Sequence, residues 1–168
     1  MVALLVPIVR YLVVWGLLLQ AGPTLAETIT GRVVGVHDGD TITVLDSTRT
    51  QHKIRLSGID APESKQAFGQ ASKRHLSDAV FNRDVTLDCG KTDKYRRQVC
   101  DVIVDGRDAN LAQIEAGMAW WYRKYQKEQT ARQRADYAAA EEGARAAKIG
   151  LWQDAVPVPP WEFRAKSR

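Results

Sequence analysis

The chain is poor in cysteine and histidine: its 168 residues include two cysteines, Cys89 and Cys100, and three histidines. A structural zinc site takes four nitrogen or sulfur ligands. Two sulfurs at this spacing, with no histidine nearby, do not complete such a set, so the scarcity argues against zinc. In an oxidising compartment an isolated pair of cysteines favours a disulfide instead. The segment between them is typical of a hairpin loop, which would make the two cysteines neighbours on adjacent strands.

The chain also lacks a strong excess of one charge, an internal repeat and any low-complexity segment. Its 24 Lys and Arg against 20 Asp and Glu give a net charge of +4 and a pI near 9.2. A mild basic excess of this size is compatible with a polyanionic partner, but it is more often ordinary solvation of the surface. Composition alone therefore selects no partner.

One apolar stretch, Met1–Leu19, opens the chain and carries a single charge, Arg10. Its run Tyr11–Leu19 has the length of a signal-peptide hydrophobic region and is short for a membrane-spanning helix. Thr24 and Ala26 are small residues at the spacing of a cleavage site. We therefore expect a signal peptide over residues 1–26 and a secreted or periplasmic protein. The alternative is an uncleaved membrane anchor.

Removal of residues 1–26 would take away one arginine and no acid, leaving 142 residues with a net charge of +3. That length is ample for one hydrophobic core. We expect a single domain over residues 27–154 and a proline-rich tail over residues 155–168. The prolines of Val156–Trp161 predict that this part of the tail is not helical and lies along the surface.

The periodicity of apolar residues predicts strands first and helices later. Strands are expected at Thr28–Val36, Thr41–Asp46, Gln51–Leu56, Val85–Cys89 and Gln98–Val104. Helices are expected at Ser64–Phe81, at Ala109–Ala116 behind an Asp108 N-cap, and from a capping box at Thr130 to Lys148. A helix between the third and fourth of five strands is the order of an OB-type barrel. The predicted fold is α+β: a five-stranded OB-type β-barrel with three α-helices.

Two short acidic segments, His37–Thr41 and Arg55–Glu63, fall at the ends of neighbouring predicted strands. Grouped carboxylates offer the oxygen ligands that a hard cation prefers. The planar guanidinium of Arg55 matches a phosphate. A cation, a phosphate and a spare carboxylate are the parts of metal-assisted phosphodiester hydrolysis.

Each segment also has an ordinary structural explanation. Asp38–Asp40 is typical of a turn between strands, and Glu63 fits the favourable acidic position at a helix start. Arg55 lies on the strand face opposite its apolar neighbours, so it points either into solvent or into a polar site. Alternation alone does not decide between the two.

Basic and aromatic residues are interleaved in two further segments, Asp93–Arg97 and Met118–Tyr125. Such interleaving suits a single-stranded nucleic acid, because cations hold phosphates while rings stack on bases. The structural alternatives are a solubilising hairpin tip for the first segment and a place in the core for Trp120 and Trp121 in the second.

Three motifs together resemble the staphylococcal (thermo)nuclease family: Asp38–Thr41, Arg55–Glu63, and Asp93–Tyr95 followed by Arg97. The resemblance runs from about Thr28 to Trp152. It implies a small secreted or periplasmic nuclease on an OB-type barrel, with Ca²⁺ as its cofactor.

The resemblance also implies individual roles for the residues at matching positions. They are the calcium ligands Asp40, Asp60 and the Ala61 carbonyl; Asp38 beside them; Arg55 and Arg97 on the scissile phosphate; Glu63 as general base; and Lys94, Tyr95 and Tyr125 on the substrate's terminal phosphate and base.

The chain departs from the family pattern at three positions. Ala61 stands where threonine is usual; this replacement keeps the backbone carbonyl as a ligand but removes a side-chain hydroxyl. Arg96 stands where glycine is common, so the loop geometry is open. Arg123 stands where a second base-stacking tyrosine is expected, so either Arg123 or Tyr122 would stack on the base.

The sequence therefore predicts a monomeric, calcium-dependent phosphodiesterase that cleaves DNA and RNA, single strands favoured, to 3′-phosphorylated products. The rival hypothesis is a non-catalytic OB-fold module that binds single-stranded nucleic acid or another anionic polymer. Such a module needs the basic and aromatic surface, but it does not need Asp40, Asp60 and Glu63 together.

Overall fold

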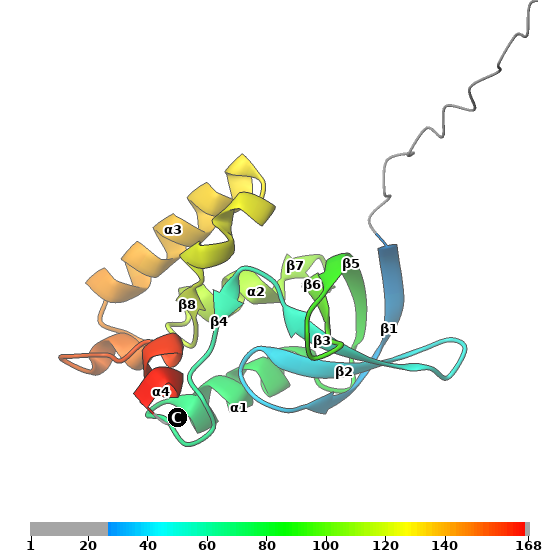
Figure 1. Ribbon diagram of the computed structural model, residues 1–168, viewed down its shortest axis with the longest axis horizontal. Coiled ribbons are helices and arrows are strands. Elements are labelled where there is room, and N and C mark those ends of the chain that lie inside the picture. The colour runs from blue at the N-terminus through cyan, green and yellow to red at the C-terminus, as the bar shows by residue number, and fades with distance from the viewer. Residues whose placement is uncertain (1–26, 167–168) are drawn as a thin grey trace, which may run out of the picture.

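Five strands close into a barrel (Figure 1). They are β1 (Glu27–Val36), β2 (Thr41–Asp46), β3 (Gln51–Leu56), β5 (Asp84–Thr92) and β6 (Gln98–Val104). Neighbours pair antiparallel in the order β3-β2-β1-β5-β6, and a parallel pairing of β3 with β6 closes the ring. The computed structural model describes residues 27–166, so the expected signal peptide at residues 1–26 lies outside the described residues. The predicted five-stranded OB-type barrel is confirmed.

Side chains of the barrel strands alternate between core and surface, as a strand requires. In β5, Val85, Leu87 and Cys89 are buried while the residues between them are exposed. The strands also approach one another closely: a Cβ at Gly31 of β1 would lie 2.5 Å from the carbonyl oxygen of Leu45. A glycine is therefore needed where β1 crosses β2.

Three helices occupy the regions in which the sequence predicts them. They are α1 (Gly69–Val80), α2 (Ala109–Glu115) and α3 (Ala131–Ala146). The Asp108 carboxylate accepts the backbone amides of Asn110 and Leu111 and so caps α2. The predicted capping box of Thr130 and Gln133 is present at α3. No helix within residues 27–166 has both the length and the apolar character that crossing a membrane requires.

Helix α1 begins later than predicted, at Gly69 rather than Ser64. The backbone of Phe68 is left-handed, with φ 65°. Tight turns precede it, in which the Gln66 amide donates to the Glu63 carbonyl at 2.8 Å. A Cβ at Gly69 would lie 2.0 Å from that same carbonyl oxygen. Glu63 therefore lies in a loop folded against the helix start, not in the first turn of the helix.

Short elements that the sequence analysis did not predict tie the helices to the barrel. They are β4 (Ile59–Asp60), β7 (Arg107–Asp108), β8 (Trp120–Trp121) and the 3₁₀ segments η1 (Arg123–Glu128) and η2 (Gly150–Gln153). Strand β4 pairs antiparallel with β8, so that Asp60 lies opposite Trp120. Two-residue strands carry no periodic signal, and only the folded chain brings these segments together.

The expectation that Val156–Trp161 is not helical is wrong at Pro160 and Trp161. Pro160 begins helix α4 (Pro160–Lys166). Proline is well tolerated at a first helical position, because no intrahelical bond needs its missing N–H. Trp161 then packs edge-on against Trp120, with ring centres 5.7 Å apart. Helix α4 thereby packs against the rest of the fold, although the prolines before it suggested a separate tail.

Cys89 of β5 and Cys100 of β6 pair directly across the two strands and are joined by a disulfide. Both are in the core, with 7% and 0% of their surface exposed. The bond lies beneath the hairpin tip that carries Asp93–Arg97.

We predict that protein produced in an oxidising compartment shows no free thiol when titrated denatured and unreduced. The Cys89→Ser/Cys100→Ser double variant should melt at a lower temperature, because closing so short a loop contributes about 2–3 kcal/mol on the chain-entropy model. The hairpin tip, which carries Lys94 and Tyr95, should also be held less firmly in this variant. Two titratable thiols in the unreduced protein would contradict the disulfide.

Candidate active site

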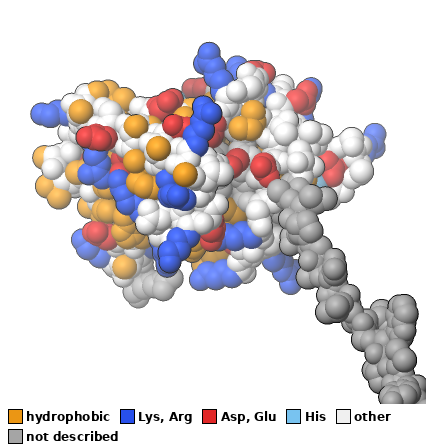
Figure 2. All heavy atoms as spheres, turned by 90° about the horizontal axis from the view of Figure 1, so that it is seen from above, with side chains coloured by type: hydrophobic (Ala, Val, Ile, Leu, Met, Phe, Trp, Pro, Cys, Tyr) orange, Lys and Arg blue, Asp and Glu red, His pale blue; other side chains and the backbone are white. Residues whose placement is uncertain are grey.

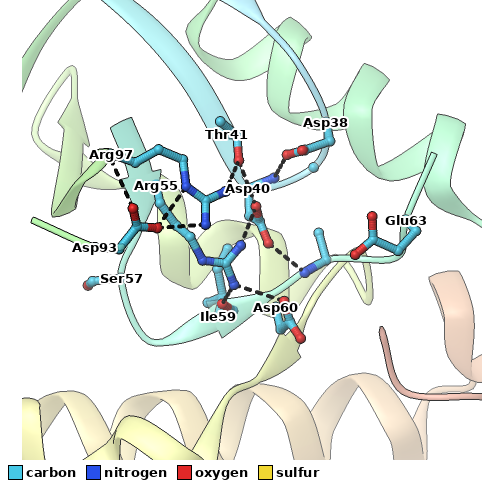
Figure 3. A network of polar contacts seen from close by, with 12 residues as sticks. Asp38, Asp40, Thr41, Arg55, Ser57, Ile59, Asp60, Glu63, Asp93 and Arg97 are labelled. Carbon is cyan, nitrogen blue, oxygen red and sulfur yellow. Dashed lines mark hydrogen bonds and ion pairs between the residues drawn. The ribbon is translucent and has the colours of Figure 1, made fainter. Parts of the chain in front are cut away.

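Arg55 lies at the centre of a polar network at the mouth of the barrel, as Figure 3 shows. Its Nη1 donates to Asp40 Oδ1 at 2.7 Å, and its Nη2 donates to Asp60 Oδ1 at 2.8 Å and to the Ile59 carbonyl at 3.1 Å. Only 15% of its side chain is exposed. Arg55 therefore points into the site, which decides the question that strand alternation left open.

Asp40 is positioned by the turn between β1 and β2. Its amide donates to Asp38 Oδ1 at 3.0 Å, and its carbonyl accepts the Leu56 amide at 2.8 Å. A Cβ at Gly39 would lie 1.8 Å from Ser72 Oγ, so the glycine lets the turn press against α1. Asp40 Oδ2 also accepts the amide of Ala61 at 3.0 Å. The Asp-Gly-Asp segment is thus both the expected turn and one side of the site.

Asp60 and Glu63 share a second arginine that the sequence analysis missed. Arg164 of α4 contacts Asp60 Oδ2 and Glu63 Oε1, each at 2.7 Å. The Asp60 side chain is fully buried, whereas that of Glu63 is 39% exposed. An isolated arginine in a proline-rich tail carries no motif or periodicity, so no sequence signal pointed to Arg164.

Arg97 faces the network from the tip of the hairpin between β5 and β6. Its guanidinium bonds Asp93 through Nε at 2.8 Å and Nη2 at 2.7 Å, and its Nη1 donates to Thr41 Oγ at 3.3 Å. Asp93 also accepts the amides of Tyr95 and Arg97, which shapes the turn. Arg96 has φ 63°, the left-handed backbone that favours glycine. The loop therefore keeps a glycine-like conformation despite its arginine.

One cleft of about 900 Å³ is lined by Asp38, Asp40, Arg55, Glu63, Asp93 and Arg97. The predicted substrate contacts Lys94, Tyr95 and Tyr125 are on its wall, together with Tyr122 and Arg164. On the face drawn in Figure 2, Lys and Arg side chains are scattered among acidic and hydrophobic ones. Basic side chains also line the cleft itself, among them Lys53, Lys91 and Lys124.

Known proteins are similar in sequence to this chain over most of its length. Residues 53–154 match the family described as staphylococcal nuclease homologue. The chain belongs to this family. An uncharacterized endonuclease of Haemophilus influenzae is 40% identical over 142 residues, covering 84% of this chain and 76% of that protein. One of Escherichia coli O157:H7 is 39% identical over 160 residues, 95% of each chain, and a micrococcal nuclease of Shigella flexneri is 39% identical over 147 residues, 82% of each.

Membership of this nuclease family makes the chain a hydrolase of phosphodiester bonds, and the resemblance inferred from the motifs is confirmed. The position at which the family pattern has a second tyrosine is Arg123 in this nuclease. Arg123 packs over the Trp121 ring at 4.3 Å and bonds Glu141 at 2.7 Å, while Tyr122 lines the cleft. Of the two residues, Tyr122 is therefore the one that lines the cleft. Trp120 and Trp121 are buried, which confirms the alternative that they belong to the core.

Burial disfavours negative charge in the active site of the nuclease. Burial first, and then the neighbouring Asp40, raise the pKa of Asp38 to about 6. Burial also raises the pKa of Asp60, although hydrogen bonds from Arg164 and the charge of Arg55 act in the opposite direction. Burial by itself would lower the pKa of Arg55, but Asp40 and Asp60 more than offset it and raise that pKa. The carboxylates therefore favour a nearby positive charge.

An oxygen-only donor set of this kind fits a hard cation such as Ca²⁺. Asp40 and Asp60 both bond Arg55, and the Asp40–Ala61 hydrogen bond brings the backbone of Ala61 alongside them. Within residues 27–166, no group of three or more His, Cys, Asp and Glu side chains is arranged to hold a metal. A cation held by two carboxylates and one carbonyl would therefore take its other ligands from water and substrate.

We expect Arg55→Lys to reduce turnover almost as much as Arg55→Ala, by about 10²–10³-fold. Lysine keeps the charge but lacks the planar fork that reaches Asp40, Asp60 and the Ile59 carbonyl at once. The measurement is kcat at saturating single-stranded DNA, with circular dichroism to verify folding. Arg83→Lys, in an exposed pair with Asp105, is the matched control and should leave kcat unchanged. A near-normal kcat for Arg55→Lys would show that turnover does not need the planar guanidinium of Arg55.

The raised pKa of Asp38 predicts a pH dependence of stability in metal-free protein. The folded state keeps a proton on Asp38 up to about pH 6, whereas the unfolded chain releases it near pH 4. Stability from this group is therefore lost as pH rises between those values. Asp38→Asn can still accept the Asp40 amide and should melt several degrees higher than wild type at pH 7, with the gap closing toward pH 4.

Thermal unfolding in EDTA from pH 4 to pH 7.5 measures this gap. Asp46→Asn is the control of opposite sign, because hydrogen bonds from His52, Thr48 and Thr50 lower the pKa of Asp46. That variant should be less stable than wild type at pH 7, by an amount that stays nearly constant down to about pH 4, because the unfolded carboxyl takes up its proton only near that pH. A gap between Asp38→Asn and wild type that does not change with pH would refute the prediction.

Proposed function

We propose that this nuclease hydrolyses phosphodiester bonds in DNA and RNA at the cleft in the barrel mouth, with Ca²⁺ as cofactor and 3′-phosphorylated products. One observation carries the proposal: carboxylates and guanidiniums from three separate segments converge at this cleft. The segments are the turn with Asp40, the stretch from Arg55 to Glu63, and the hairpin tip with Arg97. A surface that only binds nucleic acid needs cations and rings, but it has no use for buried carboxylates.

Asp40, Asp60 and the Ala61 carbonyl would hold the cation. When bound there, Ca²⁺ supplies positive charge that polarises a phosphate oxygen and offsets charge developing on it. Asp38 supports the site from behind, because its hydrogen bond from the Asp40 amide, 3.0 Å long, fixes the turn that presents Asp40.

Arg55 and Arg97 would hold the scissile phosphate. Asp93 grips Arg97 through two nitrogens, at 2.8 and 2.7 Å, and so fixes the plane of its guanidinium. Donors that are already oriented need little reorganisation as charge builds on the phosphate oxygens, which is the basis of electrostatic catalysis.

Glu63 would take the proton of the attacking water. Its side chain is 39% exposed while that of Asp60 is fully buried, so water reaches Glu63 more readily. A general base also has to lie within hydrogen-bond reach of the water it activates. The loop before α1 sets Glu63 on the cleft wall, and Arg164 contacts both Glu63 and the buried Asp60. A water held by Glu63 there would be close to the phosphate.

Exposed rings backed by cations support a preference for single strands. Tyr95 is 64% exposed and Tyr125 39%. Lys94 lies 5.0 Å from the ring of Tyr95, and Lys91 lies 4.4 Å from that of Tyr125. Stacking of this kind requires bases that are free of a duplex.

The same proposal places the nuclease outside the cytoplasm, either secreted or in the periplasm. It rests on the apolar segment and small residues of 1–26. The Cys89–Cys100 disulfide is in keeping with an oxidising compartment.

Incubation of the protein with end-labelled single-stranded DNA or RNA, in Ca²⁺ or in EDTA, tests the proposed function. We expect cleavage in Ca²⁺, its loss in EDTA, and 3′-phosphate ends by mass spectrometry. Glu63→Gln should fold normally and bind calcium and DNA, yet lose most turnover, since its amide cannot take a proton from water. Glu142→Gln, at an exposed position on α3, is the matched control and should cleave normally.

Binding of these oligonucleotides without cleavage under every condition would favour the rival, a non-catalytic OB-fold module. Cleavage that survives EDTA would remove Ca²⁺ from the mechanism. Normal turnover of Glu63→Gln would remove Glu63 as the base.

A further inference from the structure

The C-terminal helix places a positive charge inside the active site. Arg164 donates from Nη1 to Glu63 Oε1 and from Nη2 to Asp60 Oδ2, both at 2.7 Å, and Nη1 lies 3.3 Å from Asp60 Oδ1. Asp60 and Arg164 are 104 residues apart in the chain. The proposed mechanism gives Arg164 no task, although it contacts both the proposed cation ligand and the proposed base.

Guanidinium groups cover both carboxylate oxygens of Asp60. Oδ1 accepts from Arg55 at 2.8 Å and Oδ2 from Arg164 at 2.7 Å, in a side chain with no exposed surface. A divalent cation that uses Asp60 needs an oxygen of this same carboxylate. Two positive groups on one carboxylate also repel each other strongly at short range.

Helix α4 is docked by contacts that do not involve Arg164. The Trp161 ring stacks on Tyr122 with centres 5.4 Å apart and planes 11° apart. Ahead of the helix, the Val158 carbonyl accepts the side-chain amide of Gln66 at 2.5 Å. Figure 1 shows α4 beside the segment that leads into α1. Arg164 is thus presented to the site by a docked helix and is not a side chain reaching in from solvent.

We propose that Arg164 is an internal competitor for the cation, so that its contact with Asp60 and Glu63 and the binding of Ca²⁺ to Asp60 exclude one another. The inference rests on the proposed function, because it takes Asp60 as a cation ligand. The apparent calcium affinity is then the intrinsic affinity multiplied by the fraction of molecules in which Arg164 is withdrawn. Helix α4 thereby sets the calcium concentration at which the nuclease becomes active.

Calorimetric titration of the full chain with Ca²⁺ alone, without nucleic acid, measures this competition. Arg164→Gln should lower the calcium Kd about tenfold. Lys166→Gln removes an exposed charge from the same helix and should change Kd by less than about twofold, since exposed charges are screened. Trp161→Ala keeps Arg164 but removes its stacked anchor, so it should also lower Kd. Direct loss of charge cannot explain that last result.

Hydrogen exchange in the wild-type protein gives a second readout that needs no variant to fold. Addition of Ca²⁺ should speed exchange of the α4 amides, because the helix loses its Arg164 contacts. A calcium Kd for Arg164→Gln equal to or weaker than that of wild type, or α4 exchange that Ca²⁺ slows or leaves unchanged, would overturn the competition and leave the proposed function standing. Absence of calcium binding in wild type and Arg164→Gln alike would overturn the proposed cofactor itself.

Discussion

One buried guanidinium holds the active site together. Arg55 bonds Asp40, Asp60 and the Ile59 carbonyl within a single planar fork, and it thereby joins the end of β3 to the start of β2 and to β4. Unpaired charges at this depth would be costly, and removal of one partner from such a network leaves the others uncompensated. The pairing therefore explains how a small barrel keeps two carboxylates buried side by side, which a cation site requires.

The barrel supplies the register that this network needs. Thr41 pairs with Arg55 across β2 and β3, and the parallel pairing of β3 with β6 sets Arg55 against Val99. Closure of the ring consequently brings the β5–β6 hairpin, with Arg97 at its tip, over the same mouth. The cross-strand disulfide braces that hairpin from below. Catalytic candidates on turns and tips gain their precision from the paired strands under them.

The signals that predicted the fold are local. Strand alternation, the Asp108 cap and the Thr130–Gln133 capping box each depend on residues within a few positions, so short-range sterics and hydrogen bonding decide them. The same reasoning fails at the start of α1, where apolar periodicity continues into a segment that Phe68 and Gly69 fold into turns. It fails again at Pro160, since a proline can either end or begin a helix.

Strand alternation, helix caps and short motifs were enough to predict the barrel, the acidic and basic residues that the chemistry requires, and the family to which the chain belongs. Three features became visible only in the folded chain: Arg55 points inward, Tyr122 and not Arg123 lines the cleft, and Arg164 contacts Asp60 across 104 positions of sequence. Those outcomes depend on barrel closure, on the β4–β8 pairing and on the docking of Trp161. Contacts between distant segments leave no local pattern, because burial and charge pairing select them only after the core has formed.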